Sequence, residues 1–353
     1  MSYGQTSREF KLACAKAANM AGTASNTGEG GSVVTVRGGE VEYTEYLLTK
    51  PNGYLIAQFA SGRWGVSVDY LLHCDAIEIK IGQGAKPGMG GHLMGEKVTE
   101  EIARARGIPV GTDCLSPARH LDVKSLDDLK ALVRILRDVV DYEKPIGIKL
   151  GPGRVYKDVY MACQADVDYV AVDGKLGGTG ASPDHVTQSV GLPTIAVIAP
   201  AVKAMKDAGV YGDVKLVVMG GIRNGGDVAK ALALGAHAVA MASAIQIAAG
   251  CVLCGQCTVG KCPAGICTQD PELRKRFAKG KGVDEGARLI ANFIRATTRE
   301  VAQIAAALGH RSLAEFSRED VRAVTLEAAA LAGVKLAGID DYFPATWKKI
   351  LED

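Results

Sequence analysis

Short apolar runs alternate with amphipathic stretches through the first 250 residues, and glycine-rich loops follow most of the apolar runs. Tyr54–Phe59, Ala76–Ile81 and Ile146–Leu150 have the length of strands, whereas Ser125–Val140 carries apolar residues at helical spacing. Consecutive parallel strands need a crossover connection, which is usually a helix. The alternation therefore predicts an α/β protein with a parallel sheet.

The number of strands favours a (β/α)8 TIM barrel. Seven strands are predicted, near residues 23, 55, 77, 147, 170, 217 and 240, and closure needs eight. Met1–Gly4 resembles the very end of the missing strand, so we expect the chain to start after this strand or inside it. An open doubly wound sheet is the alternative, but no G-x-G-x-x-G motif follows an early strand.

Three regions follow from this pattern. We expect the barrel over residues 1–250, a cysteine loop over 251–270, and a helical extension over 271–353 that packs on the barrel. Further predicted elements are a hairpin formed by Val33–Val36 and Val41–Leu48, and helices at Ser7–Met20, Pro200–Ala208, Val283–Leu308 and Arg318–Ala332.

Composition argues against several functional classes. Aromatic residues make up 5% of the chain and the formal net charge is +2, which suits neither a nucleic-acid platform nor a membrane surface. No signal peptide precedes the first helix, and the apolar stretch Ala238–Leu253 is too short to span a bilayer. We therefore expect a cytoplasmic protein, whose nine cysteines form no disulfide framework.

Four cysteines lie within twelve residues, as Cys251-x2-Cys254-x2-Cys257-x4-Cys262 followed by proline. Thiolates at this spacing can surround one metal centre, and the pattern is one residue longer than a ferredoxin motif. Zinc and buried free thiols are the alternatives, although zinc sites usually show two Cys-x2-Cys pairs with a longer spacer. Cys267 is predicted to be a packed thiol.

Two further loops suit a phosphate group. Gly220 and Gly221 follow one predicted strand, and Ala242 and Ser243 follow the next. In barrels, the loops after strands seven and eight commonly bind phosphate through backbone N–H groups, and Arg223 could add charge. An ordinary tight turn is the alternative.

Lysines mark a candidate substrate site. Gln83 and Lys86 lie in a glycine-rich loop after a strand, which suits a lid over an anionic substrate. Lys149 lies inside an apolar strand, where a lysine is costly unless it meets an anion. Gly178 belongs to the loop Asp173–Gly180, which could close over a cofactor. A solvated loop and a lysine that reaches water are the alternatives.

With these residues assembled, the chain resembles the FMN-binding synthase domain of glutamate synthases. The resemblance covers almost the whole chain, in the family's order, and rests on these segments: Met1-Ser2-Tyr3-Gly4, Asn26–Gly31, Gln83–Gly95, Ser116–Asp122, Lys149, Gly177–Pro183, Gly220–Arg223 and the cysteines through Thr268-Gln269-Asp270. It implies reduction of 2-iminoglutarate, formed from 2-oxoglutarate and ammonia, by FMN that receives electrons through an iron–sulfur cluster.

The resemblance also implies roles for single residues. Gly220, Gly221, Ala242 and Ser243 would bind the FMN phosphate. The loop that carries Gly178 would close over the flavin or carry electrons by lying between the flavin and the cluster. Residues near the flavin ring would be Met1, Ser2, Asn26 and Lys149, the last of them beside the N1/O2 edge. Lys86 and Gln83 would face the substrate carboxylates.

Three departures from the family pattern affect this interpretation. No amidotransferase domain is present, so a separate glutaminase-type subunit or free ammonia would supply nitrogen. The family's Cys-x5-Cys-x4-Cys motif, which binds [3Fe–4S], matches Cys251, Cys257 and Cys262, and the additional Cys254 favours [4Fe–4S]. The lid has Met89 where the family has glutamate, which leaves that glutamate's role in doubt.

Several partners and alternatives stay open. Electrons could come from a ferredoxin or an NAD(P)H-linked subunit, and the protein could be an oligomer. The nearest rival function is an N-methylglutamate synthase subunit that uses methylamine. A flavin and iron–sulfur electron-transfer module without its own substrate is a second rival, but such a relay needs no lid with Lys86.

Overall fold

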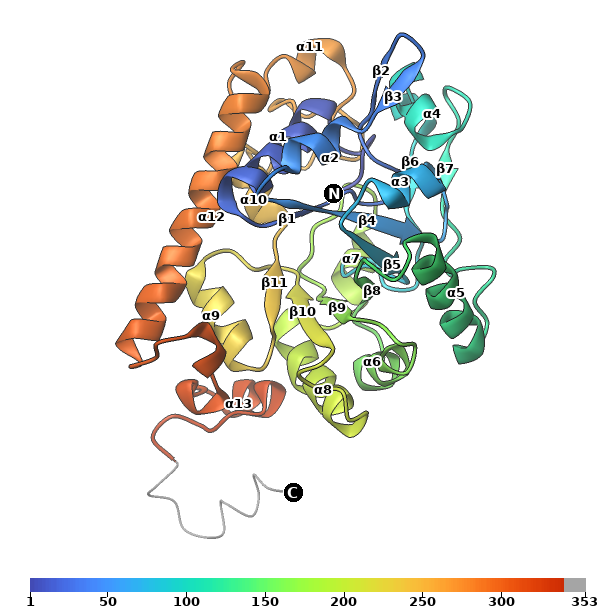
Figure 1. Ribbon diagram of the computed structural model, residues 1–353. Helices are drawn as coiled ribbons and strands as arrows, with labels where there is room; N and C mark the ends of the chain where they lie inside the picture. The colour runs from blue at the N-terminus through green and yellow to red at the C-terminus, as the bar shows by residue number, and fades with distance from the viewer. Residues whose placement is uncertain (340–353) are drawn as a thin grey trace.

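The computed structural model describes residues 1–339 and shows a curled parallel sheet with helices on its outside (Figure 1). The sheet has seven strands in the order β1-β4-β5-β8-β9-β10-β11. Their bounds are β1 Ala24–Asn26, β4 Tyr54–Ala60, β5 Ala76–Lys80, β8 Ile146–Leu150, β9 Tyr169–Asp173, β10 Lys215–Met219 and β11 Ala238–Ala240. Two small antiparallel pairs stand apart: β2 Thr35–Arg37 with β3 Glu40–Glu42, and β6 His92–Leu93 with β7 Cys114–Leu115.

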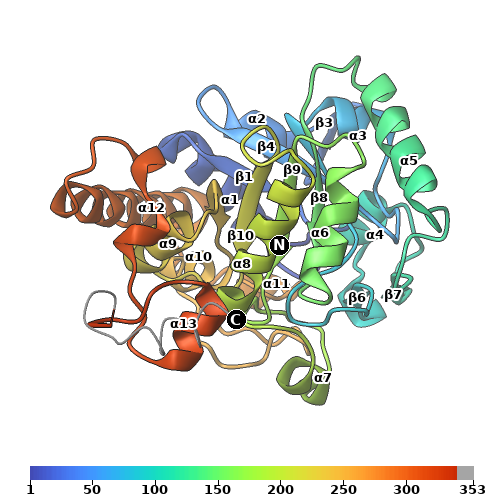
Figure 2. The ribbon, with the colours of Figure 1, turned by 90° about the horizontal axis from the view of Figure 1, so that it is seen from below.

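Helices follow most of the strands and cover the convex side of the sheet (Figure 2). The helices that accompany the sheet are α1 Arg8–Ala21, α2 Thr44–Thr49, α3 Val68–Leu72, α4 Glu100–Arg106, α5 Leu126–Val139, α6 Val155–Cys163, α7 Asp184–Ser189, α8 Thr194–Asp207, α9 Gly225–Ala233 and α10 Ser243–Ala248. After the cysteine loop come α11 Pro271–Arg274, α12 Gly282–Ala307 and α13 Leu326–Ala332. Three 3-10 turns are η1 Gly95–Lys97, η2 Leu313–Glu315 and η3 Arg318–Asp320.

The predicted α/β barrel is confirmed, with one open seam. All ladders within the seven-stranded sheet are parallel, but β1 and β11 do not pair. Met1–Gly4, expected to end a first strand, forms no strand in the described residues and makes a single bridge between Tyr3 and Thr6. The long helix α12 packs along α1 and also contacts α9 and α10, and so joins the helices on both sides of the seam.

The sheet and its covering helices share one apolar core. Ile77, Ile79, Ile146 and Ile148 are fully buried between sheet and helices, with Val133 of α5 packed among them. A second apolar cluster lies between α1, α12 and the cysteine loop. It holds the cysteine loop against the helices at the seam.

Three elements differ from the sequence prediction. Val41–Leu48 was expected to be extended, yet α2 occupies its second half, because the buried Glu45 forms a tertiary ion pair that outweighs local strand propensity. Helix α8 begins before the predicted start at Pro200, which lies inside the helix instead of opening it. The predicted helix Arg318–Ala332 is divided, because Thr325 caps a new helix through its side chain.

The C-terminal extension is helical where it is described. Ser7 caps α1 as expected, and α12 matches the predicted Val283–Leu308 closely. The last part of the predicted extension, residues 340–353, lies outside the described residues. Among residues 1–339, no helix has both the length and the apolar character needed to cross a bilayer.

Candidate active site

The predicted site residues come from the carboxyl ends of the parallel strands. Asn26 ends β1, Lys149 is the penultimate residue of β8, and Asp173 ends β9. Gly220 follows β10, and Ala242 follows β11. Because parallel strands end at one edge of the sheet, these residues gather at the barrel mouth, where barrel enzymes carry their active sites.

Lys149 is a buried cation between two carboxylates. Its Nζ lies 3.3 Å from Oδ2 of Asp173, and both side chains are mostly buried. Burial lowers the pKa of Lys149, but Asp173 and Glu78 outweigh this effect and raise the pKa above its ordinary value. Lys149 therefore keeps its proton at neutral pH. Asp173 also accepts a hydrogen bond of 2.8 Å from the backbone N–H of Gly84.

Glu78 connects Lys149 to the end of β1. Its Oε1 accepts hydrogen bonds from Nδ2 of Asn26 at 3.0 Å and from Nε2 of Gln58 at 2.8 Å. The Oδ1 atom of Asn26 accepts from the backbone N–H of Gly28 at 2.8 Å. These bonds fix the side chain of Asn26 and satisfy a fully buried carboxylate.

A second buried ion pair positions the start of the chain. Nζ of Lys11 lies 2.7 Å from Oε1 of Glu45, with both side chains at most 2% exposed. The same ammonium donates to the carbonyl oxygens of Met1, Asn26 and Thr27 at 2.8–3.2 Å. A side chain at Gly28 would collide with Met1 and Ser2, so this glycine permits their close approach.

Lys86 is a buried ammonium with few partners. Its side chain is 2% exposed, and its Nζ donates to the carbonyl oxygen of Ala181, its one hydrogen-bond acceptor within residues 1–339. Burial, with a contribution from Lys80, lowers the pKa of Lys86 to about 8. An ammonium has three N–H donors, so Lys86 retains capacity to bind an anion. Lys80 itself is engaged by Glu29 at 2.9 Å.

Gln83 lies in the same loop and is half-buried. Its backbone packs against Gly151, where a Cβ atom would lie 3.0 Å from the Gln83 carbonyl oxygen. Its side chain forms no hydrogen bond with the described residues. The amide of Gln83 is therefore free to contact a substrate.

The two predicted phosphate loops lie side by side. Gly220 and Gly221 have φ values of +101° and +74°, and Met219 pairs with Ala240 in the parallel ladder. The backbone N–H groups of Gly220 and Gly221 donate to no acceptor within residues 1–339. Successive N–H groups in such loops form concavities that bind anions. These residues fit a phosphate group.

The neighbouring loop closes over this position from β9. A Cβ atom at Gly178 would lie 2.7 Å from Oγ of Ser243, which places the predicted Gly178 and Ser243 together. Arg223 does not contribute: its side chain is 76% exposed and pairs with Asp227 at 2.9 Å on α9. The expectation that Arg223 adds charge to the phosphate site is wrong, because the i,i+4 pair directs it to solvent.

His120 is a buried structural residue. Arg63 donates to its Nδ1 at 2.8 Å, so Nδ1 is the acceptor and Nε2–H donates to the carbonyl oxygen of Lys80 at 2.7 Å. Burial lowers the pKa of His120, and Arg63 acts in the same direction. His92 is exposed on β6. Neither histidine is placed as a catalytic acid.

The cysteines of the cysteine loop differ in how deeply they are buried. Cys262 and Cys267 are buried, Cys251 and Cys257 are half-buried against the same apolar cluster, and Cys254 is exposed. Within the described residues, no three His, Cys, Asp or Glu side chains are arranged to hold a metal ion. The four motif thiols still share one loop, and Cys251, Cys257 and Cys262 belong to or pack against the same apolar cluster. Their donor chemistry fits an iron–sulfur cluster.

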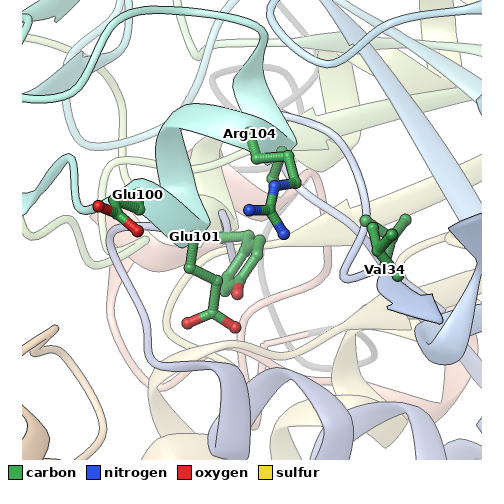
Figure 3. Close-up of a pocket in the computed structure, with 7 residues that line it drawn as sticks. Val34, Glu100, Glu101 and Arg104 are labelled. Carbon is green, nitrogen blue, oxygen red and sulfur yellow. The ribbon is translucent and has the colours of Figure 1, made fainter. Parts of the chain in front are cut away.

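A surface cavity of about 300 Å³ lies between α4 and the strand β2 (Figure 3). Glu100, Glu101 and Arg104 line it from α4, and Val34 lines the opposite wall. Glu101 is engaged by Arg8 at 3.1 Å and by a second arginine, so its charge is balanced. None of the predicted site residues lines this cavity.

Sequence reasoning missed the acidic half of the site. Glu78 and Asp173 were not assigned roles, although each is a carboxylate within or at the end of an apolar strand, where a charge requires a partner. Gln5 was also missed. Its Nε2 donates to the carbonyl oxygens of Gly180 at 3.3 Å and Cys257 at 3.1 Å, which connects the loop after β9 with the cysteine loop.

Comparison with known proteins places these observations in a family. Residues 1–311 match the family described as the conserved region in glutamate synthase. The archaeal-type glutamate synthase [NADPH] of Thermotoga maritima is 44% identical over 343 residues, which cover 96% of this chain and 64% of that protein. A glutamate synthase large subunit-like protein of Rhizobium meliloti is 42% identical over 358 residues, 97% of this chain and 77% of that protein.

A solved structure supports the fold alone. The flavin-binding domain of baker's yeast flavocytochrome b2 superposes with a TM-score of 0.54 at 15% sequence identity, covering 97% of this chain and 70% of that one. The match to the conserved region extends over most of the chain, and the relatives align almost from end to end of it. The chain therefore belongs to the glutamate synthase family.

Proposed function

We propose that this chain reduces 2-iminoglutarate to L-glutamate in the cytoplasm, with FMN and an iron–sulfur cluster as cofactors. 2-Oxoglutarate and ammonia condense to the imine with loss of water, and two electrons and two protons complete the reduction. Separate proteins would supply ammonia and electrons. FMN, when bound, would supply the hydride.

The observation that carries this proposal is the buried ammonium of Lys86 at the barrel mouth. Within residues 1–339 its one acceptor is the carbonyl oxygen of Ala181, and it lies two residues after Gly84, whose N–H donates to Asp173. A carboxylate of a dicarboxylic keto acid could bind the remaining N–H donors of Lys86 beside the Ala181 carbonyl, and such charge-assisted hydrogen bonds are about twice as strong as neutral ones. Gln83 would add a neutral donor to the same carboxylate.

Other residues would hold the cofactors. Gly220, Gly221, Ala242 and Ser243 would bind the FMN phosphate, with Gly178 allowing the loop after β9 to approach. Met1, Ser2, Asn26 and Lys149 would line the ring site, where Lys149 keeps a fixed positive charge. A preorganised charge of this kind stabilises negative charge as it develops during a reaction. Cys251, Cys254, Cys257 and Cys262 would hold the cluster.

The loops around the mouth would exclude water. Residues 82–95 and 174–183 meet where Lys86 donates to Ala181. Closure of such loops strengthens electrostatic interactions inside a site. Lys86 would therefore act both as a substrate ligand and as the contact that closes the loops.

Product analysis tests the function. The protein, purified anaerobically and reduced chemically, is incubated with 2-oxoglutarate and either ammonium or methylamine. We expect L-glutamate from ammonium, and about one FMN without adenylate released per chain on denaturation. Preferential formation of N-methylglutamate would show that the nitrogen donor is methylamine and not ammonia. If 2-oxoglutarate does not perturb the flavin spectrum, the protein is instead an electron-transfer module that has no substrate site of its own.

A further inference from the structure

Lys97 is a buried lysine whose side chain lies against the cysteine loop. It is the last residue of η1 and is 3% exposed. A Cβ atom at Gly260 would lie 3.2 Å from Cε of Lys97, so the aliphatic part of the side chain packs on this glycine. Nζ of Lys97 donates to the carbonyl oxygen of Cys257. Lys97 therefore contacts the segment that joins Cys257 to Cys262, the third and fourth cysteines of the motif.

Lys97 forms no ion pair with a carboxylate of residues 1–339. Its second acceptor is Oε1 of Gln5 at 3.4 Å, and both of its acceptors are uncharged. Burying an ammonium group is costly unless an anion compensates for its charge. Lys97 is therefore a buried positive charge that the described residues alone do not balance.

The motif cysteines would supply the missing negative charge when they hold a cluster. Their thiolates outweigh the positive charge of the iron and sulfide core, so a bound cluster is an anion. Reduction by one electron makes this anion more negative. A nearby cation attracts the reduced state more strongly than the oxidised state. The reduction potential of an iron–sulfur cluster depends on such surroundings as well as on its own net charge.

We propose that Lys97 balances the charge of the iron–sulfur cluster and raises its reduction potential. The inference rests on the proposed function, in which the cysteine loop holds that cluster. Lys97 supplies no ligand and acts through its charge alone. Without this charge the cluster would still assemble but would be harder to reduce.

Burial makes Lys97 more effective than the exposed lysine of the same loop. Lys261 directly precedes Cys262, but its side chain is exposed to water. Water weakens the interaction between two charges several-fold relative to a site within the protein, and dissolved salt weakens it further. Lys97 should therefore influence the cluster more strongly than Lys261, although Lys261 is a direct sequence neighbour of a motif cysteine.

Gln5 contacts the same part of the cysteine loop without carrying a charge. Its Nε2 donates to the carbonyl oxygen of Cys257 at 3.1 Å, and its Oε1 accepts from Lys97. Replacing Gln5 removes a hydrogen bond to the loop but keeps the positive charge. The comparison between Gln5 and Lys97 therefore separates a contact that holds the loop from a charge that acts on the cluster.

The reduction potential of the cluster tests the proposal. Protein is purified anaerobically, its iron content is measured, and paramagnetic resonance is recorded on samples poised with mediators at graded potentials. Lys97→Met removes the charge, and Lys97→Gln removes it while keeping a donor for the Cys257 carbonyl. In both variants, the ratio of reduced to oxidised cluster at a fixed potential should fall about tenfold or more. Tenfold corresponds to a potential lowered by about 59 mV for a one-electron couple.

Lys261→Met and Gln5→Leu are the matched controls, and each should change this ratio by less than about threefold. The proposal is overturned if both Lys97 variants keep the wild-type potential, or if either control shifts it as far as Lys97→Met. It is also overturned if neither Lys97 variant assembles a cluster, because Lys97 would then hold the loop together. Wild-type protein that takes up no iron would contradict the proposed function instead. Glutamate formation is measured separately.

Discussion

At the scale of single residues, the barrel mouth is organised by three buried lysines with different surroundings. Lys149 lies among carboxylates, Lys11 pairs with Glu45 and binds backbone carbonyls, and Lys86 has one neutral acceptor. The positive charges of Lys149 and Lys11 are balanced by carboxylates of the protein itself. Of these three lysines, Lys86 alone forms no ion pair with a carboxylate of residues 1–339, which is the condition expected of an anion-binding residue.

Lys149→Ala should lower the rate of glutamate formation about a hundredfold, equivalent to about 3 kcal/mol, because it removes a fixed positive charge from the site. The exposed α6 variant Lys157→Ala should retain the wild-type rate. Steady-state turnover under anaerobic conditions measures both. An unchanged turnover of Lys149→Ala, with FMN still bound, would show that the charge only balances Asp173.

Affinity for 2-oxoglutarate should fall as pH rises through 8. The pKa of Lys86 is lowered to about 8, so the ammonium is charged below that pH and neutral above it. Above pH 8 the dissociation constant should rise up to about tenfold per pH unit, and below about pH 7 it should be constant. Titrating the visible spectrum with 2-oxoglutarate at each pH measures this.

The matched variants for this titration are Lys86→Met and Lys175→Met. The first should bind weakly at every pH and lose the dependence on pH near 8. Lys175 lies at the same end of the sheet but donates to the Gln188 carbonyl oxygen, so its replacement should keep the wild-type profile. If the dissociation constant of Lys86→Met for 2-oxoglutarate still rises above pH 8, the titrating group is not Lys86.

At the scale of elements, the strands and the glycine loops were predictable, but their mutual contacts were not. The apolar runs locate β4, β5 and β8 because a buried parallel strand needs side chains that are apolar on both faces. That Glu78 of β5 faces Lys149 of β8 depends on the parallel register that pairs Lys80 with Lys149. Helix α2 was missed for the same reason, since it depends on the distant Lys11.

The candidate site shows the same division. Glycines at the ends of β10 and β11 are visible in the sequence because their loops have a recognisable composition. Gln5 could not be assigned, because its two acceptors, Gly180 and Cys257, are 175 and 252 residues away in the chain. Polar side chains that bridge loops leave no local pattern.

The cysteine loop makes a prediction about cluster type. If Cys254 is the fourth ligand, the oxidised wild-type protein should hold [4Fe–4S] and give no paramagnetic resonance signal, and Cys254→Ser should give the signal of [3Fe–4S]. Cys163→Ala, a change in α6 away from the loop, should resemble wild type. A strong signal in oxidised wild type that Cys254→Ser does not change would show that Cys254, which is exposed here, is no ligand.

At the scale of the whole molecule, α12 connects the two ends of the sheet. It packs on α1, which precedes β1, and on α9, which precedes β11, so it joins elements that the open seam separates. The stability of the barrel should therefore depend on a helix that carries none of the predicted site residues. Ile290 is the residue of α12 that shows this best, since it is 1% exposed in the cluster shared with α1.

Ile290→Ala should lower the free energy of unfolding by about 2–5 kcal/mol, the range for large-to-small changes in a core. The exposed variant Arg299→Ala, on the same helix, should change it by about 0.5 kcal/mol or less. Urea denaturation followed by circular dichroism measures both. A loss for Ile290→Ala no larger than for Arg299→Ala would show that α12 is dispensable for the seam.

The open seam also bears on how copies of this chain can associate. An unpaired strand edge is a template for adding a strand from another molecule, and proteins limit this hazard by keeping edge strands very short. β1 and β11 have three residues each, the shortest strands of the sheet, so each offers few free backbone groups. These few free N–H and C=O groups at the seam give little support to pairing between the strand edges of two molecules. Self-association of the folded chain should therefore proceed through side-chain surfaces and leave the sheet at seven strands.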